Sequence, residues 1–264
     1  MSLLEIPKTK NINSIMISNR IIQSLWVGGP LNPLALLCIN SYLFHGHEFH
    51  LYVYEKIEVP KGIILRDATN ILPQHQIFKD KYGSYAAFSD WFRYELLYKY
   101  GGWWTDMDVV CLKHFNTEED YAFATELFGI DNCVVATSNI KVPPKSKLME
   151  DCLDAIQKIE DLPSINWFEI GAHLLSEKIC KNSLEDYIRD PNVFTPISLS
   201  TSEILFQNSY IKFSNLTYSV HFYNNKLRTA GFDLYKKFHH NSLYERLKKK
   251  YCTEKRTLLT PAKK

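Results

Sequence analysis

The stretch GGWWTDMDVV, residues 101–110, places two carboxylates inside a run that otherwise predicts a buried strand. An unpaired charge that leaves water costs several kcal/mol. The acids must therefore either pair with other side chains or hold a cation at the end of the strand. Because residues i and i+2 of an extended strand point to the same face, Asp106 and Asp108 can aim at one place if the strand is still extended there.

Two carboxylates on one face repel each other unless a cation lies between them or one of them stays protonated. Oxygen ligands favour a hard ion such as Mg²⁺ or Mn²⁺ over zinc, and such ions usually keep open positions for substrate phosphates. Asp106 and Asp108 therefore predict a metal–diphosphate site. The alternatives for a bare Asp-x-Asp are a helix cap or a solvated strand end.

The residues before this stretch predict an amphipathic helix over 84–100, which ends at Gly101-Gly102. Asp90 and Arg93 lie one turn apart on that helix and could form a simple structural ion pair. However, the helix leads directly into the acidic strand, and open α/β sheets bind their ligands at the carboxyl ends of strands. A polar pair in this position favours a binding site.

The order of elements predicts an α/β fold with a central, mostly parallel sheet flanked by helices. A strand at 20–29, a helix at 32–46 and strands at 48–55 and 62–68 follow a β-α-β order. No internal repeat or linker divides the chain, so we expect a single domain over 1–264. Within it we expect a lead-in at 1–19 and a basic helix and tail at 242–264. Further elements are expected as strands at 121–127, 133–139 and 218–223, and as helices at 146–160, 168–180 and 200–206.

The composition is that of an ordinary globular protein, with 264 residues, 45% hydrophobic and 23% charged. A net charge of +2 gives no support for nucleic acid as a partner. The six cysteines show no CxxC spacing, and neither a signal peptide nor a membrane span is evident, so we expect a cytoplasmic protein. The basic tail, residues 245–264, could contact an anionic membrane surface peripherally.

The motif SDWFRYELLYKYGGWWTDMDV, residues 89–109, resembles the DXD-containing sugar-transferase region. That region is shared by family 32 glycosyltransferases, yeast-type mannosyltransferases and the glucosylating bacterial toxins. A second stretch, IIQSLWVGG at 21–29, is similar to the family's opening strand, and weaker similarity extends through 48–55, 62–68 and 168–175. The matching positions are Gln23, Trp26, Gly28, Gly29, Ser89, Asp90, Arg93, Gly101, Gly102, Trp104, Asp106 and Asp108.

The resemblance implies a GT-A (Rossmann-like) fold and a nucleotide-sugar donor. Trp26 would stack on the base, beside glycines that let the ligand approach the backbone. Asp90 and Arg93 would contact the donor sugar, Asp106 the ribose and sugar, and Asp108 the metal. The implied catalytic set is Asp90, Arg93, Asp106 and Asp108, and the implied donor-binding set is Trp26, Gly28, Ser89, Asp90, Arg93, Asp106 and Lys226.

Enzymes of this family complete the metal site from their C-terminal region. Here YSVHFYNNKLR, residues 218–228, offers His221 as a ligand and Lys226 for the diphosphate. The stretch departs from the family's His followed by Ser-Trp or Lys-Pro-Trp endings, so His221, Asn224 or both could be the partner of Asp108. A lone strand histidine is more often structural, and that alternative also stays open.

The sequence as a whole predicts a metal-dependent retaining hexosyltransferase that uses Mn²⁺ or Mg²⁺. A UDP-sugar is the first donor candidate and GDP-mannose the second. The expected acceptor is a glycan or lipid-linked glycan, as in lipopolysaccharide or capsular polysaccharide synthesis. The alternatives are a toxin-like transferase with a protein acceptor, a catalytically silent sugar-nucleotide-binding module, and a nucleotide-sugar hydrolase.

Four other features were weighed for a functional role. Glu126 and Asp131-Asn132 follow a strand beside the predicted site and are candidates for the acceptor side. Of Trp103 and Trp104, which face opposite sides of a strand, we expect one in the core and consider the other as an acceptor platform. The histidines of HGHEFH, residues 45–50, span a turn and do not predict a zinc site.

Overall fold

The structure is a computed structural model that describes residues 19–128, 132–166, 168–252 and 259–260. All but Asn19 of the predicted lead-in at 1–19, and most of the basic tail beyond residue 252, lie outside the described residues.

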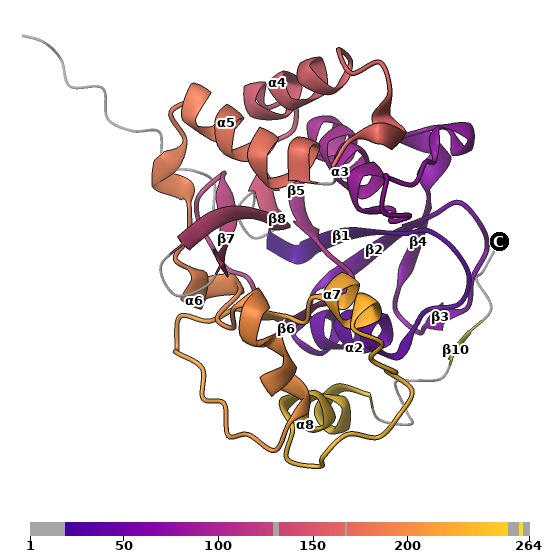
Figure 1. The fold of residues 1–264 in the computed structure, drawn as a ribbon, viewed down its shortest axis with the longest axis vertical. Helices are drawn as coiled ribbons and strands as arrows, with labels where there is room; N and C mark the ends of the chain where they lie inside the picture. Colours follow the sequence, from indigo (N-terminus) through magenta and orange to yellow (C-terminus); the bar gives the residue numbers. More distant parts are fainter. Residues whose placement is uncertain (1–18, 129–131, 167, 253–258, 261–264) are drawn as a thin grey trace, which may run out of the picture.

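A six-stranded sheet forms the centre of the molecule, in the order β4-β2-β1-β5-β8-β7 (Figure 1). Strands β4, β2, β1 and β5 run parallel, whereas β8 is antiparallel to both of its neighbours. The predicted α/β fold with a mostly parallel sheet is thereby confirmed. The bounds are β1 Ile21–Trp26, β2 Glu48–Val53, β4 Ile64–Asp67, β5 Gly102–Thr105, β7 Ala122–Phe128 and β8 Asn132–Val142.

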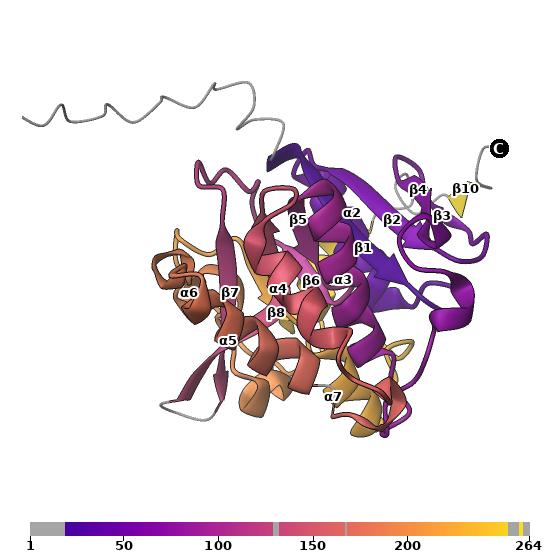
Figure 2. The same cartoon turned by 90° about the horizontal axis from the view of Figure 1, so that it is seen from above.

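Helices cover both faces of this sheet, as a buried parallel sheet requires. Helices α3 (Ala86–Tyr100), α4 (Lys147–Ile156) and α5 (Leu174–Lys181) lie over one face, and Figure 2 views the sheet through them. Helix α2 (Pro33–Phe44) packs on the other face, and its first turn is capped by the Asn32 side chain, which accepts a hydrogen bond from the Ala35 N–H (2.8 Å).

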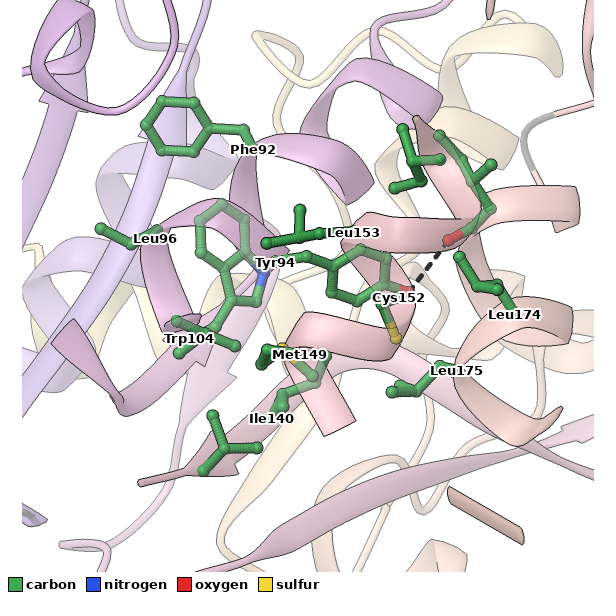
Figure 3. Close-up of a cluster of buried hydrophobic side chains, with 14 of the residues drawn as sticks. Phe92, Tyr94, Leu96, Trp104, Ile140, Met149, Cys152, Leu153, Leu174 and Leu175 are labelled. Carbon is green, nitrogen blue, oxygen red and sulfur yellow. Dashed lines mark hydrogen bonds between the residues drawn. The ribbon is translucent and has the colours of Figure 1, made fainter. Parts of the chain in front are cut away.

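Both tryptophans of β5 belong to the core, so the prediction of a core tryptophan is confirmed and the prediction that the other is an acceptor platform is wrong. Trp103 packs against the α2 side with Phe115 and Phe194, and Trp104 packs against the α3 side with Phe92 (Figure 3). Each is 1% exposed. The two rings point to opposite faces of a sheet that is covered on both sides, and each face buries its own ring.

The C-terminal part adds a third cluster of buried apolar residues beside α2. A short antiparallel pair, β6 (Val109–Cys111) with β9 (Ser219–His221), leads into α7 (Asn224–Thr229). Helix α8 (Leu243–Tyr251) follows, lies against α2 and carries the basic run 248–250. Smaller elements are β3 (Val59–Pro60), β10 (Leu259–Thr260), α6 (Pro191–Phe194) and a 3-10 helix at Leu199–Phe206. None of the described helices is both long and apolar enough to cross a membrane.

The predicted single strand through the two acids is interrupted. Strand β5 ends at Thr105, which is also the last residue that pairs with β8. The chain then turns at 106–108, where the Val109 N–H donates to the Asp106 carbonyl (3.1 Å), and β6 leaves the main sheet to pair with β9. A turn, and not the alternation of an extended strand, therefore sets the directions of Asp106 and Asp108.

Candidate functional site

The acidic turn lies at the carboxyl edge of the parallel strands, next to the end of β1. The Ser24 hydroxyl donates to the Thr105 carbonyl (2.7 Å) and ties the two strand ends together. A cavity of about 470 Å³ opens at this edge. Six of the predicted site residues line it: Trp26, Ser89, Arg93, Asp106, Asp108 and Asn224.

Asp106, Asp108 and His221 form a group that can hold a metal ion, since one possible ligand atom from each lies within 4.8 Å of the others. The β6–β9 register places His221 opposite Val109, and its Nε2 atom is 3.2 Å from Asp108 Oδ1. Two carboxylates and one imidazole fit a divalent ion such as Mn²⁺. Among the described residues no other group of three His, Cys, Asp or Glu side chains has this arrangement.

The two acids of the group have opposite pKa shifts: burial raises the pKa of Asp106, although Arg93 opposes the shift. Burial opposes ionisation of Asp108, but the neighbouring His221 and a hydrogen bond from the Asn224 N–H (2.7 Å) outweigh it, so the pKa of Asp108 lies below its usual value. Burial would lower the pKa of His221, but the carboxylates of Asp108 and Glu126 raise it well above its usual value. A cation between these ligands would take over the role of the proton.

Arg93 connects the helix α3 pair to the acidic turn. Its Nη2 atom lies 3.3 Å from Asp90 Oδ1 and 3.1 Å from Asp106 Oδ1, and its guanidinium stacks 4.8 Å from the centre of the Trp104 ring. Trp104 Nε1 also donates to Asp106 Oδ1 (2.8 Å). Asp90 and Arg93 are thus one end of a buried network that reaches Asp106, and not only a structural pair on a helix surface.

Asp90 lies in a tight and poorly solvated place. Burial raises its pKa to about 6, although Arg93 opposes the shift. Its side chain faces Gly171, where an added Cβ would lie 2.7 Å from Asp90 Oδ2. The Tyr94 hydroxyl donates to the carbonyls of Ile170 (2.9 Å) and Gly171 (3.2 Å) and so fixes this approach. Sequence reasoning did not assign Gly171 a role; the only signal was weak similarity over 168–175.

Besides Asp108, two side chains contact the His221 ring. Glu126 Oε1 lies 2.8 Å from His221 Nδ1, and the Tyr223 ring lies over the imidazole with the centroids 4.1 Å apart. Tyr223 adopts a left-handed backbone (φ 53°), which costs of the order of 1 kcal/mol and turns the Asn224 N–H toward Asp108. Glu126, expected on the acceptor side, therefore contacts the histidine of the metal group.

The remaining predicted residues are Asp131, Asn132, Lys226 and Gly28. Asp131 lies outside the described residues, and nothing is described of the Asn132 side chain. The Lys226 ammonium lies 2.6 Å from a Glu203 carboxylate oxygen and donates to the Leu199 carbonyl, and Lys226 is not among the residues that line the cavity. Gly28 lies two residues after Trp26, and its backbone φ of +108° is one that only glycine adopts readily.

Two cations that sequence reasoning missed, Lys79 and Arg228, line the cavity. Both are exposed. Lys79 lies in a stretch without a family motif, and Arg228 is the last residue of the 218–228 stretch, where the sequence departs from the family's endings. Within the described part of the chain, the histidines at 45, 47 and 50 belong to no group of three possible metal ligands. The His47 ring stacks on His114 with the ring centroids 4.1 Å apart.

Residues 50–124 match the family model described as "Glycosyltransferase sugar-binding region containing DXD motif". The chain carries a DXD-type glycosyltransferase region. This confirms the resemblance expected from the sequence and the prediction of a glycosyltransferase. The matched segment contains Asp90, Arg93, Asp106 and Asp108, whereas Trp26, Glu126 and His221 lie outside it.

Among solved structures, one named "PaToxG Glycosyltransferase" is 15% identical, with 64% of this chain and 75% of that chain covered and a TM-score of 0.47. Another, of a transferase mutant, is 10% identical, with 66% of this chain and 92% of that chain covered and a TM-score of 0.44. No curated protein matches the sequence of this chain.

Proposed function

We propose that this glycosyltransferase transfers a hexose from a nucleotide-diphosphate sugar in a reaction that depends on a divalent metal. A UDP-sugar is the first donor candidate and GDP-mannose the second. One observation carries the proposal: the possible ligand atoms of Asp106, Asp108 and His221 lie within 4.8 Å of one another, and the two acids line a cavity together with Trp26 and Arg93. Metal, phosphate and base contacts are thereby available along one cavity.

Asp108 and His221 are the proposed ligands of Mn²⁺ or Mg²⁺, and Asp106 is close enough to join them. Asn224 stays the alternative ligand: it lines the cavity, and the hydrogen bond from its backbone N–H to Asp108 Oδ2 (2.7 Å) does not involve its side-chain oxygen. When bound by these residues, such an ion would neutralise the developing charge of the leaving diphosphate as a Lewis acid. Asp108, ionised through its hydrogen bonds, supplies the negative charge that retains such an ion.

The donor would be positioned by the residues around this centre. The half-buried Trp26, whose indole N–H donates to the Gly29 carbonyl (2.8 Å), presents a fixed ring for the base. Ser89, Asp90 and Arg93 would orient the sugar hydroxyls, and Asp106 the ribose and sugar.

Cations would stabilise the developing negative charge on the leaving diphosphate. Arg93 already lies in the cavity, and Lys79 and Arg228 line it as well. Lys226 can reach a ligand only by leaving Glu203. We therefore add Lys79 and Arg228 to Lys226 as candidate diphosphate contacts.

Retention of anomeric configuration, through front-face attack by an acceptor hydroxyl, is the stereochemical course that we propose from the family resemblance. Among the residues that the structure describes, the acids that line the cavity are Asp106 and Asp108. Both are committed to the metal group and to Arg93, which leaves neither as a free nucleophile and supports a course without a glycosyl–enzyme intermediate.

We propose a glycan or lipid-linked glycan as the acceptor, in cytoplasmic polysaccharide synthesis with peripheral contact to the membrane. The support is the basic last turn of α8, where Lys248, Lys249 and Lys250 follow one another. Sedimentation with phosphatidylglycerol-containing vesicles, but not with pure phosphatidylcholine vesicles, is the expected result for the membrane contact.

The test of the proposed function is nucleotide release from a panel of UDP- and GDP-sugars, with Mn²⁺ or with chelator. Asp108→Ala should abolish metal-dependent release, whereas Asp154→Ala, an exposed acid on α4, is the matched control and should behave as the parent. Metal-dependent nucleotide binding without release, in the presence of every acceptor glycan tried, would indicate a silent binding module. If the protein neither binds a nucleotide nor releases one from any sugar of the panel, the proposal is overturned.

A further inference from the structure

We propose that Glu126 is a positioning residue for the metal centre and acts through His221; this inference rests on the metal site of the proposed function. Glu126 Oε1 lies 2.8 Å from His221 Nδ1, and Asp108 Oδ1 lies 3.2 Å from His221 Nε2. Each of the two carboxylates thus contacts a different nitrogen of the His221 ring. With Nδ1–H donated to Glu126, Nε2 is directed at the place between the acids of the 106–108 turn.

The position of Glu126 excludes it from the ligand group itself. The atoms that lie within 4.8 Å of one another come from Asp106, Asp108 and His221, and no Glu126 oxygen is among them. Glu126 therefore stands behind the imidazole as seen from the acids. A carboxylate that accepts the second ring N–H of a metal-bound histidine fixes the tautomer and the ring orientation.

The fold holds Glu126 and His221 together through a short connecting segment. Glu126 is on β7 and His221 on β9, which belong to different sheets. The segment 194–198 bridges them, because the Ser198 hydroxyl donates to the Leu127 carbonyl (2.8 Å) and the Ser219 hydroxyl donates to the Phe194 carbonyl (2.9 Å). The distance between the two side chains is therefore set by backbone on both sides.

The imidazole has little freedom to find another orientation. The Tyr223 ring covers it at 4.1 Å, and the Tyr223 hydroxyl is anchored on the Ile197 carbonyl (2.7 Å). The side chains of His221 and Glu126 are only 10% and 15% exposed. Among the described residues, the Glu126 carboxylate hydrogen-bonds His221 Nδ1. Removing this carboxylate would free the imidazole to turn its Nε2 away from the acids.

The test is the affinity of the full chain for Mn²⁺ alone, measured from free Mn²⁺ by electron paramagnetic resonance. Glu126→Ala should weaken binding about 10- to 100-fold. Glu126→Gln retains an acceptor oxygen for the Nδ1–H, so its loss should be smaller. In a His221→Ala background, Glu126→Ala should cause no further loss. Glu203→Ala, an acid paired with Lys226 outside the ligand group, is the control and should bind as the parent.

Each other outcome has one meaning. If the parent binds Mn²⁺ and Glu126→Ala binds equally well, the positioning role is overturned while the metal site stands. If the loss persists without His221, Glu126 acts on the ion directly and the inference is also overturned. If the parent itself binds no Mn²⁺, the proposed metal site fails, which is distinguishable from the other two results. Should Glu126→Ala not fold, the same cycle with Glu126→Leu decides, because leucine fills much of the side-chain volume and has no acceptor oxygen for the Nδ1–H.

Discussion

Gly171→Ala should displace Asp90 and so impair the donor site, although Gly171 is not among the residues that line the cavity. The added Cβ would lie 2.7 Å from Asp90 Oδ2, and ordinary contact begins at 3.4 Å, so the carboxylate must retreat by about 0.7 Å. Asp90 is 3% exposed and lies 3.3 Å from Arg93 Nη2, which in turn lies 3.1 Å from Asp106. The displacement is therefore passed along the network toward the metal group.

Overpacking of this size in a buried place costs about 1–3 kcal/mol of the free energy of unfolding. Misplacement of a positioning group by up to about 1 Å lowers turnover by as much as about 100-fold. We therefore expect donor turnover to fall by about 10- to 100-fold in Gly171→Ala. Gly29→Ala, where an added Cβ has no neighbour within 4 Å, is the matched control for stability and should cost little.

A double-mutant cycle in urea unfolding isolates the contact. In an Asp90→Ala background, Gly171→Ala should cost at least about 1 kcal/mol less than in the parent, because the carboxylate that its Cβ meets is gone. An equal cost in both backgrounds would refute the steric reasoning. The conformation of residue 171 would then be the cause of any loss.

Three further predictions concern charge and burial. Burial raises the pKa of Asp90 to about 6 from 3.8, so ionised Asp90 costs the folded state up to about 3 kcal/mol above pH 6 and nothing below pH 4. In urea unfolding, the stability of Asp90→Asn relative to the parent should rise between pH 4 and pH 6 and stay at the higher value at pH 7. A difference in unfolding free energy between the two proteins that does not change with pH contradicts this. Trp103→Phe removes a core indole whose N–H donates to Asn19. It should lower the free energy of unfolding by about 1–3 kcal/mol and leave donor turnover unchanged. Unchanged stability with reduced donor turnover would mark Trp103 as part of the site. Arg228→Met should raise the KM for the donor more than Lys226→Met does, and the opposite order would show that Lys226 leaves Glu203 on binding.

Local sequence signals predicted the elements that frame the site. Strand β1 ends at Trp26, just before the glycines at 28–29. Helix α2 begins at Pro33 and ends at Phe44, two residues before Gly46. Helix α3 ends at Gly101, which has φ 62° and where a Cβ would lie 2.4 Å from the Pro144 nitrogen, so glycine is required. These boundaries depend on residues within a few positions, and a sequence displays such information directly.

The parts that could not be predicted depend on contacts between distant segments. His221 was a candidate, but its alignment with the acidic turn comes from the β6–β9 register, which joins residues more than a hundred positions apart. The contacts of Glu126 and Gly171 with site residues follow from packing between elements that no local pattern links. The break after Thr105 comes from the turn at 106–108: the Asp106 N–H still donates to the Ser138 carbonyl of β8 (2.9 Å), and the chain then leaves the main sheet to pair with β9. β-propensity does not predict such a turn.

The central claim is that Asp106, Asp108 and His221 hold a divalent ion that in turn binds the donor diphosphate. Calorimetric titration of UDP and of GDP into the parent protein, with Mn²⁺ and then with chelator, tests it most directly, with Asp108→Asn measured alongside. We expect one nucleotide to bind only with Mn²⁺, and we expect Asp108→Asn to weaken that binding more than about 10-fold. Equal binding with chelator, or an Asp108→Asn protein that binds as the parent does, would contradict the account.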